Sequence, residues 1–131
     1  MKNRVTFLIL LITASTFGQE AMRRWRKMNQ VRNDKFDLVL PEVMREKNIA
    51  MWIVTNREGN LDPLYSDMGE GYVGGNAYYI FTDIGEERIE RAALGVGGYL
   101  LKEGGSYDYF GSADELKEFV TKRDPKTIGL N

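Results

Sequence analysis

The sequence predicts a small α/β domain, and three segments carry this prediction. Apolar residues recur at helical spacing in residues 34–47, where Phe36, Leu40 and Met44 share one face. Residues 49–55 form a continuous apolar run whose length and β-branched content favour a strand covered on both faces. A helix signal at Ser112 then precedes a further strand at residues 127–131. The 131 residues are enough for one ordinary domain.

Residues 1–18 are typical of a signal peptide. Lys2 and Arg4 precede an apolar run at residues 5–12, and small and polar residues follow it. The run is too short for a stable membrane span. We therefore expect an exported protein, periplasmic or secreted, that is cleaved near Gly18 and has a mature domain at residues 19–131. A buried N-terminal helix or an uncleaved anchor remains the alternative.

Residues 19–33 are expected to start the first helix. Their basic residues favour a solvated helix face over a membrane or partner surface, because the segment lacks a sustained apolar face; they are Arg23, Arg24, Arg26, Lys27 and Arg32. Pro41 interrupts the helical pattern of residues 34–47. The helix must therefore kink there or restart with Pro41 in its first turn.

The middle of the chain is expected to be a long loop followed by a hairpin. Residues 56–76 contain two turn-forming clusters, and loops of this length are often functional. Residues 77–82 and 87–94 are expected to pair around a turn at 83–86. The returning strand carries Arg88, Glu90 and Arg91 and has no strongly apolar side, which predicts an edge strand.

The last third is expected to be a loop, a capped helix and a strand. Residues 95–111 are rich in glycine and aromatic residues, which cover the sheet or, less favoured, stack on a ligand; these aromatic residues are Tyr99, Tyr107, Tyr109 and Phe110. Ser112 and Glu115 have the spacing of a capping box, and Leu116, Phe119 and Val120 form the buried stripe of the helix that follows. Asp124 and Pro125 end this helix.

Composition excludes several kinds of chemistry from this chain. It contains no histidine and no cysteine, which rules out Ser-His-Asp and Cys-His catalysis, H-E-x-x-H zinc sites and zinc fingers within it. The formal net charge of −1 shows no basic excess, so a nucleic-acid partner is unsupported. The G-x-G-x-x-G pattern at residues 69–74 precedes a strand rather than a helix, which favours a turn over a dinucleotide site.

Acidic residues do not form a recognisable metal site in the sequence. Their spacing does not fit an EF-hand loop, so a solvated acidic loop is the favoured interpretation; the residues in question are Asp62, Asp67, Glu70 and Asp83. We predict no metal-binding residue, no catalytic residue and no cofactor for this chain.

The candidate site lies just beyond the apolar strand at residues 49–55. Open α/β sheets bind ligands outside the carboxyl ends of their strands. An arginine there can clamp a carboxylate, and an acidic residue can orient that arginine or accept a proton. A surface ion pair that ties the loop together is the slightly favoured alternative. The candidates for substrate-cleft or interdomain contact are Asn56, Arg57, Glu58, Asp62 and Tyr65.

A series of short motifs supports a family resemblance between about residue 32 and residue 131. They are KFD at 35–37, LPEVMR at 40–45, MWIV at 51–54, RE at 57–58, DPLY at 62–65, IFTD at 80–83, IER at 89–91, DPK at 124–126 and IGLN at 128–131. In order and spacing they resemble the amino-terminal domain of the creatinase, prolidase and aminopeptidase P metallopeptidases. The pattern is most similar to exported bacterial Xaa-Pro-aminopeptidase-like proteins.

The resemblance implies a three-layer α/β/α fold with a mixed sheet and a ribonuclease H-like outline. It also implies that catalysis belongs to a carboxy-terminal domain, absent from these residues, that holds two divalent metal ions. This chain would then be non-catalytic, shape the cleft for a proline-containing peptide and support a homo-oligomer. The alternative is a free-standing exported domain that binds a small molecule or peptide.

Overall fold

The computed structural model describes residues 2–69 and 71–131, and it describes side chains from residue 18 onward except at residue 70. The predicted signal peptide lies almost entirely outside the residues whose side chains are described, so it stays a prediction. Among the described residues, no helix is both long enough and apolar enough to cross a membrane.

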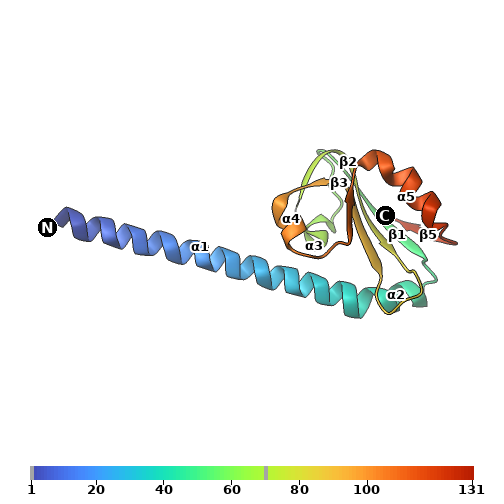
Figure 1. The fold of residues 1–131 in the computed structure, drawn as a ribbon, viewed down its shortest axis with the longest axis horizontal. Coiled ribbons are helices and arrows are strands. Elements are labelled where there is room, and N and C mark those ends of the chain that lie inside the picture. The colour runs from blue at the N-terminus through green and yellow to red at the C-terminus, as the bar shows by residue number, and fades with distance from the viewer. Residues whose placement is uncertain (1, 70) are drawn as a thin grey trace.

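The centre of the domain is a five-stranded mixed sheet in the order β4-β3-β2-β1-β5 (Figure 1). β1 (Met51–Arg57), β2 (Tyr72–Thr82) and β3 (Glu90–Gly97) form its antiparallel part. The short β4 (Tyr109–Gly111) and β5 (Ile128–Leu130) lie parallel to β3 and β1. The predicted α/β class with a mixed sheet is thereby confirmed.

The last part of one continuous helical segment, residues 35–46, covers one face of the sheet (Figure 1). α1 (Lys2–Asp34) passes through a π-helical turn, η1 (Lys35–Val39), into α2 (Leu40–Glu46). In that turn the N–H of Leu40 donates to the oxygen of Lys35, five residues back. Pro41 then occupies the first turn of α2, where its missing N–H costs no helical hydrogen bond. Of the two predicted alternatives, a kink at Pro41 and a restart with Pro41 in the first turn, the structure shows the second.

The sheet carries an apolar core on each face. On the α2 side, the Phe36 and Phe81 rings meet edge to face with centroids 4.9 Å apart. On the other side, α5 (Leu116–Arg123) places Phe119 against Ile53 and Ile80. α2 and α5 therefore cover opposite faces (Figure 1). β1 contributes to both cores, as the continuous apolar run predicts, although β2 rather than β1 is the middle strand.

The predicted capping box and stop signal of the last helix are confirmed. The Ser112 N–H donates to Glu115 Oε1 at 2.7 Å, and Ser112 Oγ accepts from the Asp114 N–H at 3.3 Å. These bonds begin a short 3₁₀ turn, η2 (Ala113–Glu115), that leads into α5. Asp124 then adopts φ 44°, a left-handed conformation that ends the helix before Pro125.

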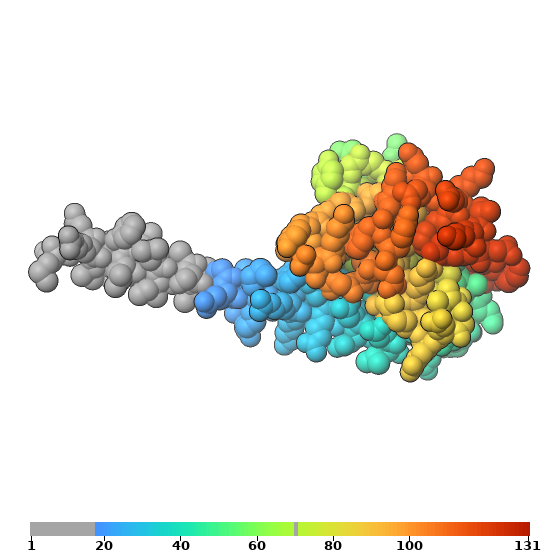
Figure 2. Space-filling view, viewed as in Figure 1, coloured from blue at the N-terminus to red at the C-terminus, as the bar shows by residue number. Residues whose placement is uncertain are grey.

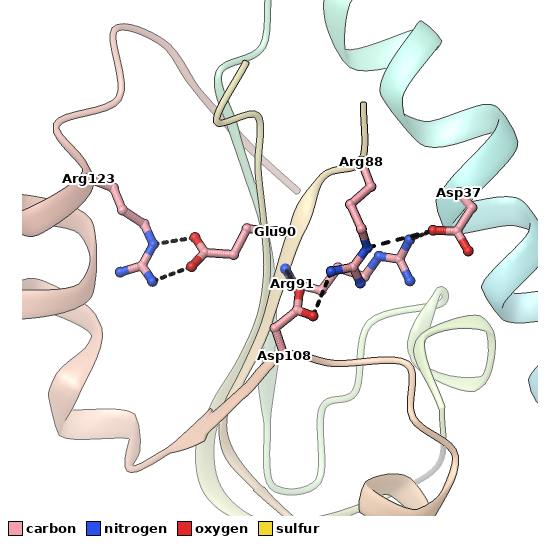
Figure 3. A network of polar contacts seen from close by, with 6 residues as sticks. All are labelled: Asp37, Arg88, Glu90, Arg91, Asp108 and Arg123. Carbon is pink, nitrogen blue, oxygen red and sulfur yellow. Dashed lines mark hydrogen bonds and ion pairs between the residues drawn. The ribbon is translucent and has the colours of Figure 1, made fainter. Parts of the chain in front are cut away.

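The prediction that the third strand is an edge strand is wrong. β3 lies between β2 and β4, and Arg91 on it is only 1% exposed. Its charges point to opposite faces and find partners there (Figure 3). Arg91 pairs with Asp37 of η1, and Glu90 accepts two bonds from Arg123 of α5 at 2.5 and 2.7 Å. Charged residues are tolerated inside this sheet because each has an opposite charge.

Two segments expected to be loops contain regular structure. Residues 56–76 include α3 (Tyr65–Met68) and the first part of β2, and residues 95–111 include α4 (Tyr99–Glu103) and β4. The pairing of β2 with β3 shifts register between Val73 and Tyr78, where exposed glycines interrupt the alternation that identifies a strand.

Candidate functional site: the loop after β1

Asn56 holds the start of this loop rather than facing solvent. It lies near the end of β1 and is 3% exposed. Its Oδ1 accepts the Asp62 N–H at 2.9 Å. Its Nδ2 is buried and has no hydrogen-bond partner among the described residues. Asn56 therefore fixes the path of the loop and faces away from any solvent-borne ligand.

Asp62 connects the loop to the residue that follows β5, the strand beside β1. Its Oδ1 accepts the Leu64 N–H at 2.7 Å, which orients the turn into α3. Its Oδ2 accepts a hydrogen bond from Asn131 Nδ2, and the Thr55 N–H donates to Asn131 Oδ1 at 3.3 Å. Asp62 thus joins β1, the loop and the residue after β5.

Arg57 and Glu58 occupy an exposed turn at the tip of the loop. The backbones of Arg57 and Asn60 exchange hydrogen bonds of 3.3 and 2.9 Å, and Gly59 supplies the φ of 73° that this turn needs. Within the residues that the structure describes, neither Arg57 nor Glu58 forms an ion pair. The ion-pair alternative is therefore not observed there, and both side chains are accessible to a partner.

Tyr65 is the candidate residue that lines a hollow beside the loop. This hollow has a volume of about 510 Å³ and is bounded by Gly59, Leu61, Tyr65, Gly71, Tyr72 and Val73. The Tyr65 hydroxyl donates to the oxygen of Gly71. A Cβ on Gly71 would lie 2.5 Å from Val96 Cγ1, so the close approach of the two strands requires glycine. The structure thus separates Tyr65 from the other candidates.

Two further tyrosines hold the backbone at the end of α3. The Tyr79 hydroxyl donates to the oxygen of Gly69 at 2.6 Å, and the Tyr107 hydroxyl donates to the oxygen of Met68 at 2.5 Å. Burial raises the pKa of both hydroxyls, so they remain neutral donors at physiological pH. Tyr107 thereby belongs to the core, as favoured from sequence, whereas Tyr99 is 73% exposed.

The acidic residues near the loop are engaged in separate contacts. Asp67 pairs with Lys35 at 3.1 Å, and Asp83 pairs with Arg45 at 2.9 Å. The residues that the structure describes contain no cluster of three acidic side chains able to hold a metal ion. The geometry of the loop therefore suits contact and recognition through Arg57, Glu58 and Tyr65.

Sequence reasoning missed a second polar site on α1. Arg32, expected on a solvated face, is 9% exposed, and Asn29 beside it is 8% exposed. Extending the buried stripe of Phe36 and Met44 backwards by steps of three or four residues reaches Arg32 and Asn29. The periodicity was therefore present, with polar residues occupying its buried positions.

Comparison of the chain with protein-family models, with curated proteins and with solved structures finds no match. The family resemblance consequently rests on the sequence motifs alone.

Proposed function

We propose that this chain is the non-catalytic amino-terminal domain of an exported Xaa-Pro-aminopeptidase-like metallopeptidase. In this role it forms one wall of the substrate cleft and supports assembly. The chemistry would belong to a separate domain that supplies the two divalent metal ions. Arg57, Glu58 and Tyr65 would face that domain or its proline-containing peptide, while Asn56 and Asp62 would hold the loop in place.

The observation that carries this proposal is the contact between Asp62 and Asn131. It places the residue after β5 beside the candidate loop, although 69 positions separate the two in sequence. A polypeptide continuing beyond Asn131 would begin next to Thr55 and Asp62, at the base of the loop that carries Arg57 and Glu58. A domain attached there is positioned to close over the exposed turn, which accounts for charged side chains without described partners.

We also propose the finer architecture that the resemblance implies, a three-layer α/β/α domain with a ribonuclease H-like outline. Its support is the placement of α2 and α5 on opposite faces of one mixed sheet. An experimental structure in which both helices lie on one face would refute it.

Apolar side chains on the helical segment support a role in assembly. Leu38, Val39 and Val43 are 72%, 54% and 43% exposed. Val39 and Val43 also line an apolar groove of about 460 Å³ together with Trp52 and Leu64. Exposed apolar groups in such proximity are typical of protein contacts. If they form an oligomer interface, Leu38→Glu lowers the mass measured by light scattering, and Leu130→Glu, a distant exposed leucine, does not.

The experiment for the cleft role uses the full reading frame that contains this domain. An open frame downstream of Asn131 that encodes Asp, His and Glu metal ligands is the expected finding. In that protein, Arg57→Ala and Glu58→Ala should raise the KM for Xaa-Pro peptides, while Lys117→Ala on exposed α5 should not. Unchanged kinetics and assembly in both loop variants would refute the cleft role. Metal-dependent Xaa-Pro cleavage by residues 19–131 alone would refute a non-catalytic domain.

The second candidate is a free-standing exported domain that binds a small molecule or peptide. The hollow of about 510 Å³ beside Tyr65 favours it, because it exposes Leu61 and Tyr72 next to fixed backbone groups. A natural stop codon directly after Asn131, together with saturable peptide binding that Tyr72→Ala abolishes, would support this candidate over the first.

A further inference from the structure

A cavity lies where α1 crosses the rest of the domain. Its volume is about 310 Å³, and it is bounded by α1, α3 and α4. Figure 2 shows the described part of α1, in blue, meeting the domain beside the orange segment that contains α4. Trp25, Met28, Leu100 and Leu101 form its apolar walls, and Arg32 and Ser66 are among its polar groups. It is distinct from the hollow at Tyr65.

Arg32 brings a positive charge to the bottom of this cavity. Its Nε donates to the oxygen of Asp67 at 2.9 Å, and its Nη1 donates to Asn29 Oδ1. No described residue forms a hydrogen bond with Nη2 of Arg32. This atom is also not fully buried. Nη2 is therefore an accessible donor that no described residue engages.

The surrounding charges leave Arg32 with an excess of positive charge. The Asp67 carboxylate is occupied by Lys35 Nζ at 3.1 Å, so it does not neutralise the guanidinium. Arg24 also lines the cavity, but Glu20 holds it at 2.9 Å. The Ser66 hydroxyl has no hydrogen bond to any described residue and adds a second donor. Among the described residues that line the cavity, no carboxylate is left to neutralise Arg32.

We propose that this cavity binds a small organic carboxylate with an apolar body. Arg32 Nη2 and the Ser66 hydroxyl donate to the carboxylate, a charge-assisted arrangement stronger than one between neutral groups. Trp25, Met28 and the two leucines cover the body. The volume of about 310 Å³ is at the lower end for ligand sites, which suits a single ring or a short chain. The apolar walls disfavour inorganic phosphate.

The first test compares phenylacetate with phenylacetamide, its neutral isostere, by calorimetry or amide chemical-shift titration of the chain. Phenylacetate should bind saturably, with shifts at Trp25 and Arg32, and the amide should bind roughly tenfold more weakly because it lacks the charge-assisted bonds. Equal binding of the two compounds, or no binding of phenylacetate, would overturn the proposal.

The second test uses variants of residues that line the cavity. Leu100 is 50% exposed, so Leu100→Glu adds a negative charge at the cavity without opening the core, and should weaken phenylacetate binding at least about tenfold. Tyr99→Glu is the matched control, because Tyr99 is 73% exposed on the same short helix and does not line the cavity. Arg32→Gln should abolish the preference for the acid over the amide. Retention of wild-type affinity by Leu100→Glu would refute the site.

Discussion

The buried ion pair between Arg91 and Asp37 offers the sharpest test of how the first helix is held to the sheet. The Arg91 side chain is 2% exposed, and its guanidinium lies over the Phe36 ring at 5.2 Å. Its Nε is buried without a partner among the described residues, so Asp37 is its main neutralising contact. Asp37→Ala leaves a buried cation without its partner.

The magnitude follows from how deeply each partner is buried. Removing one partner of a fully buried pair costs about 3–5 kcal/mol, and an exposed pair contributes about 0.2–1 kcal/mol. Asp37 is 48% exposed, so water replaces part of its interaction. Arg88 lies 4.0 Å from the same carboxylate and pairs with Asp108 at 2.7 Å (Figure 3). As a second cation it cannot replace Asp37 as a partner of Arg91. We expect a loss of about 2 kcal/mol for Asp37→Ala.

The assay is urea unfolding followed by circular dichroism, with a double-mutant cycle. Arg91→Met in the Asp37→Ala background should recover part of the loss, because an apolar chain replaces the unpaired cation. Asp124→Asn is the matched control, since the Asp124–Lys126 pair is 84% exposed on both sides and should contribute nothing measurable. A loss below about 0.5 kcal/mol, or strictly additive effects in the cycle, would refute the reasoning.

Three further predictions concern other contacts. The hydrogen bond from Arg45 lowers the pKa of Asp83 in the folded state. The pair therefore stabilises the fold at pH values above the ordinary carboxylate pKa, and this stabilisation is lost as the pH falls. Arg45→Met should reduce the dependence of the unfolding midpoint on acid pH. Burial raises the pKa of Tyr107, so stability should be intact below about pH 10 and fall as pH rises further, and Tyr107→Phe should cost about 1 kcal/mol at neutral pH in urea titrations. Gly71→Ala should cost about 1–3 kcal/mol by thermal unfolding, whereas Gly75→Ala, in open space, should not. Neutral behaviour of Arg45→Met, Tyr107→Phe or Gly71→Ala would contradict the corresponding contact.

Local signals predicted the elements whose causes are local. The capping box at Ser112 and the restart at Pro41 depend on residues within a few positions, and the structure shows both. β3 was misjudged because its charges are matched from far away: Arg91 meets Asp37 at a separation of 54 positions. No sequence window contains both partners. The pattern of charged and apolar residues within the strand therefore cannot distinguish this inner strand from an edge strand.

The sequence identifies the candidate loop but does not say which of its residues build the loop and which face outward. The rule that ligands lie beyond strand ends points to the loop after β1, but it cannot distinguish a residue that builds the loop from one that faces outward. That distinction depends on Asp62 reaching Asn131 and on Tyr65 reaching the hollow. The first contact joins residues 69 positions apart, and the second follows from the backbone path around Gly71.

The contacts of Arg32 and Asp37 bear on the same helical segment, and this links the proposed cavity to stability. Asp37 anchors η1 through Arg91, while Arg32 anchors α1 through the backbone of Asp67. A ligand that binds only when α1 is docked stabilises the docked state by about 2.7 kcal/mol at a hundredfold excess over its dissociation constant. That is similar to the expected cost of Asp37→Ala. A carboxylate in the cavity should therefore offset the loss of an ion pair that it does not touch, because both act on the docking of one helix.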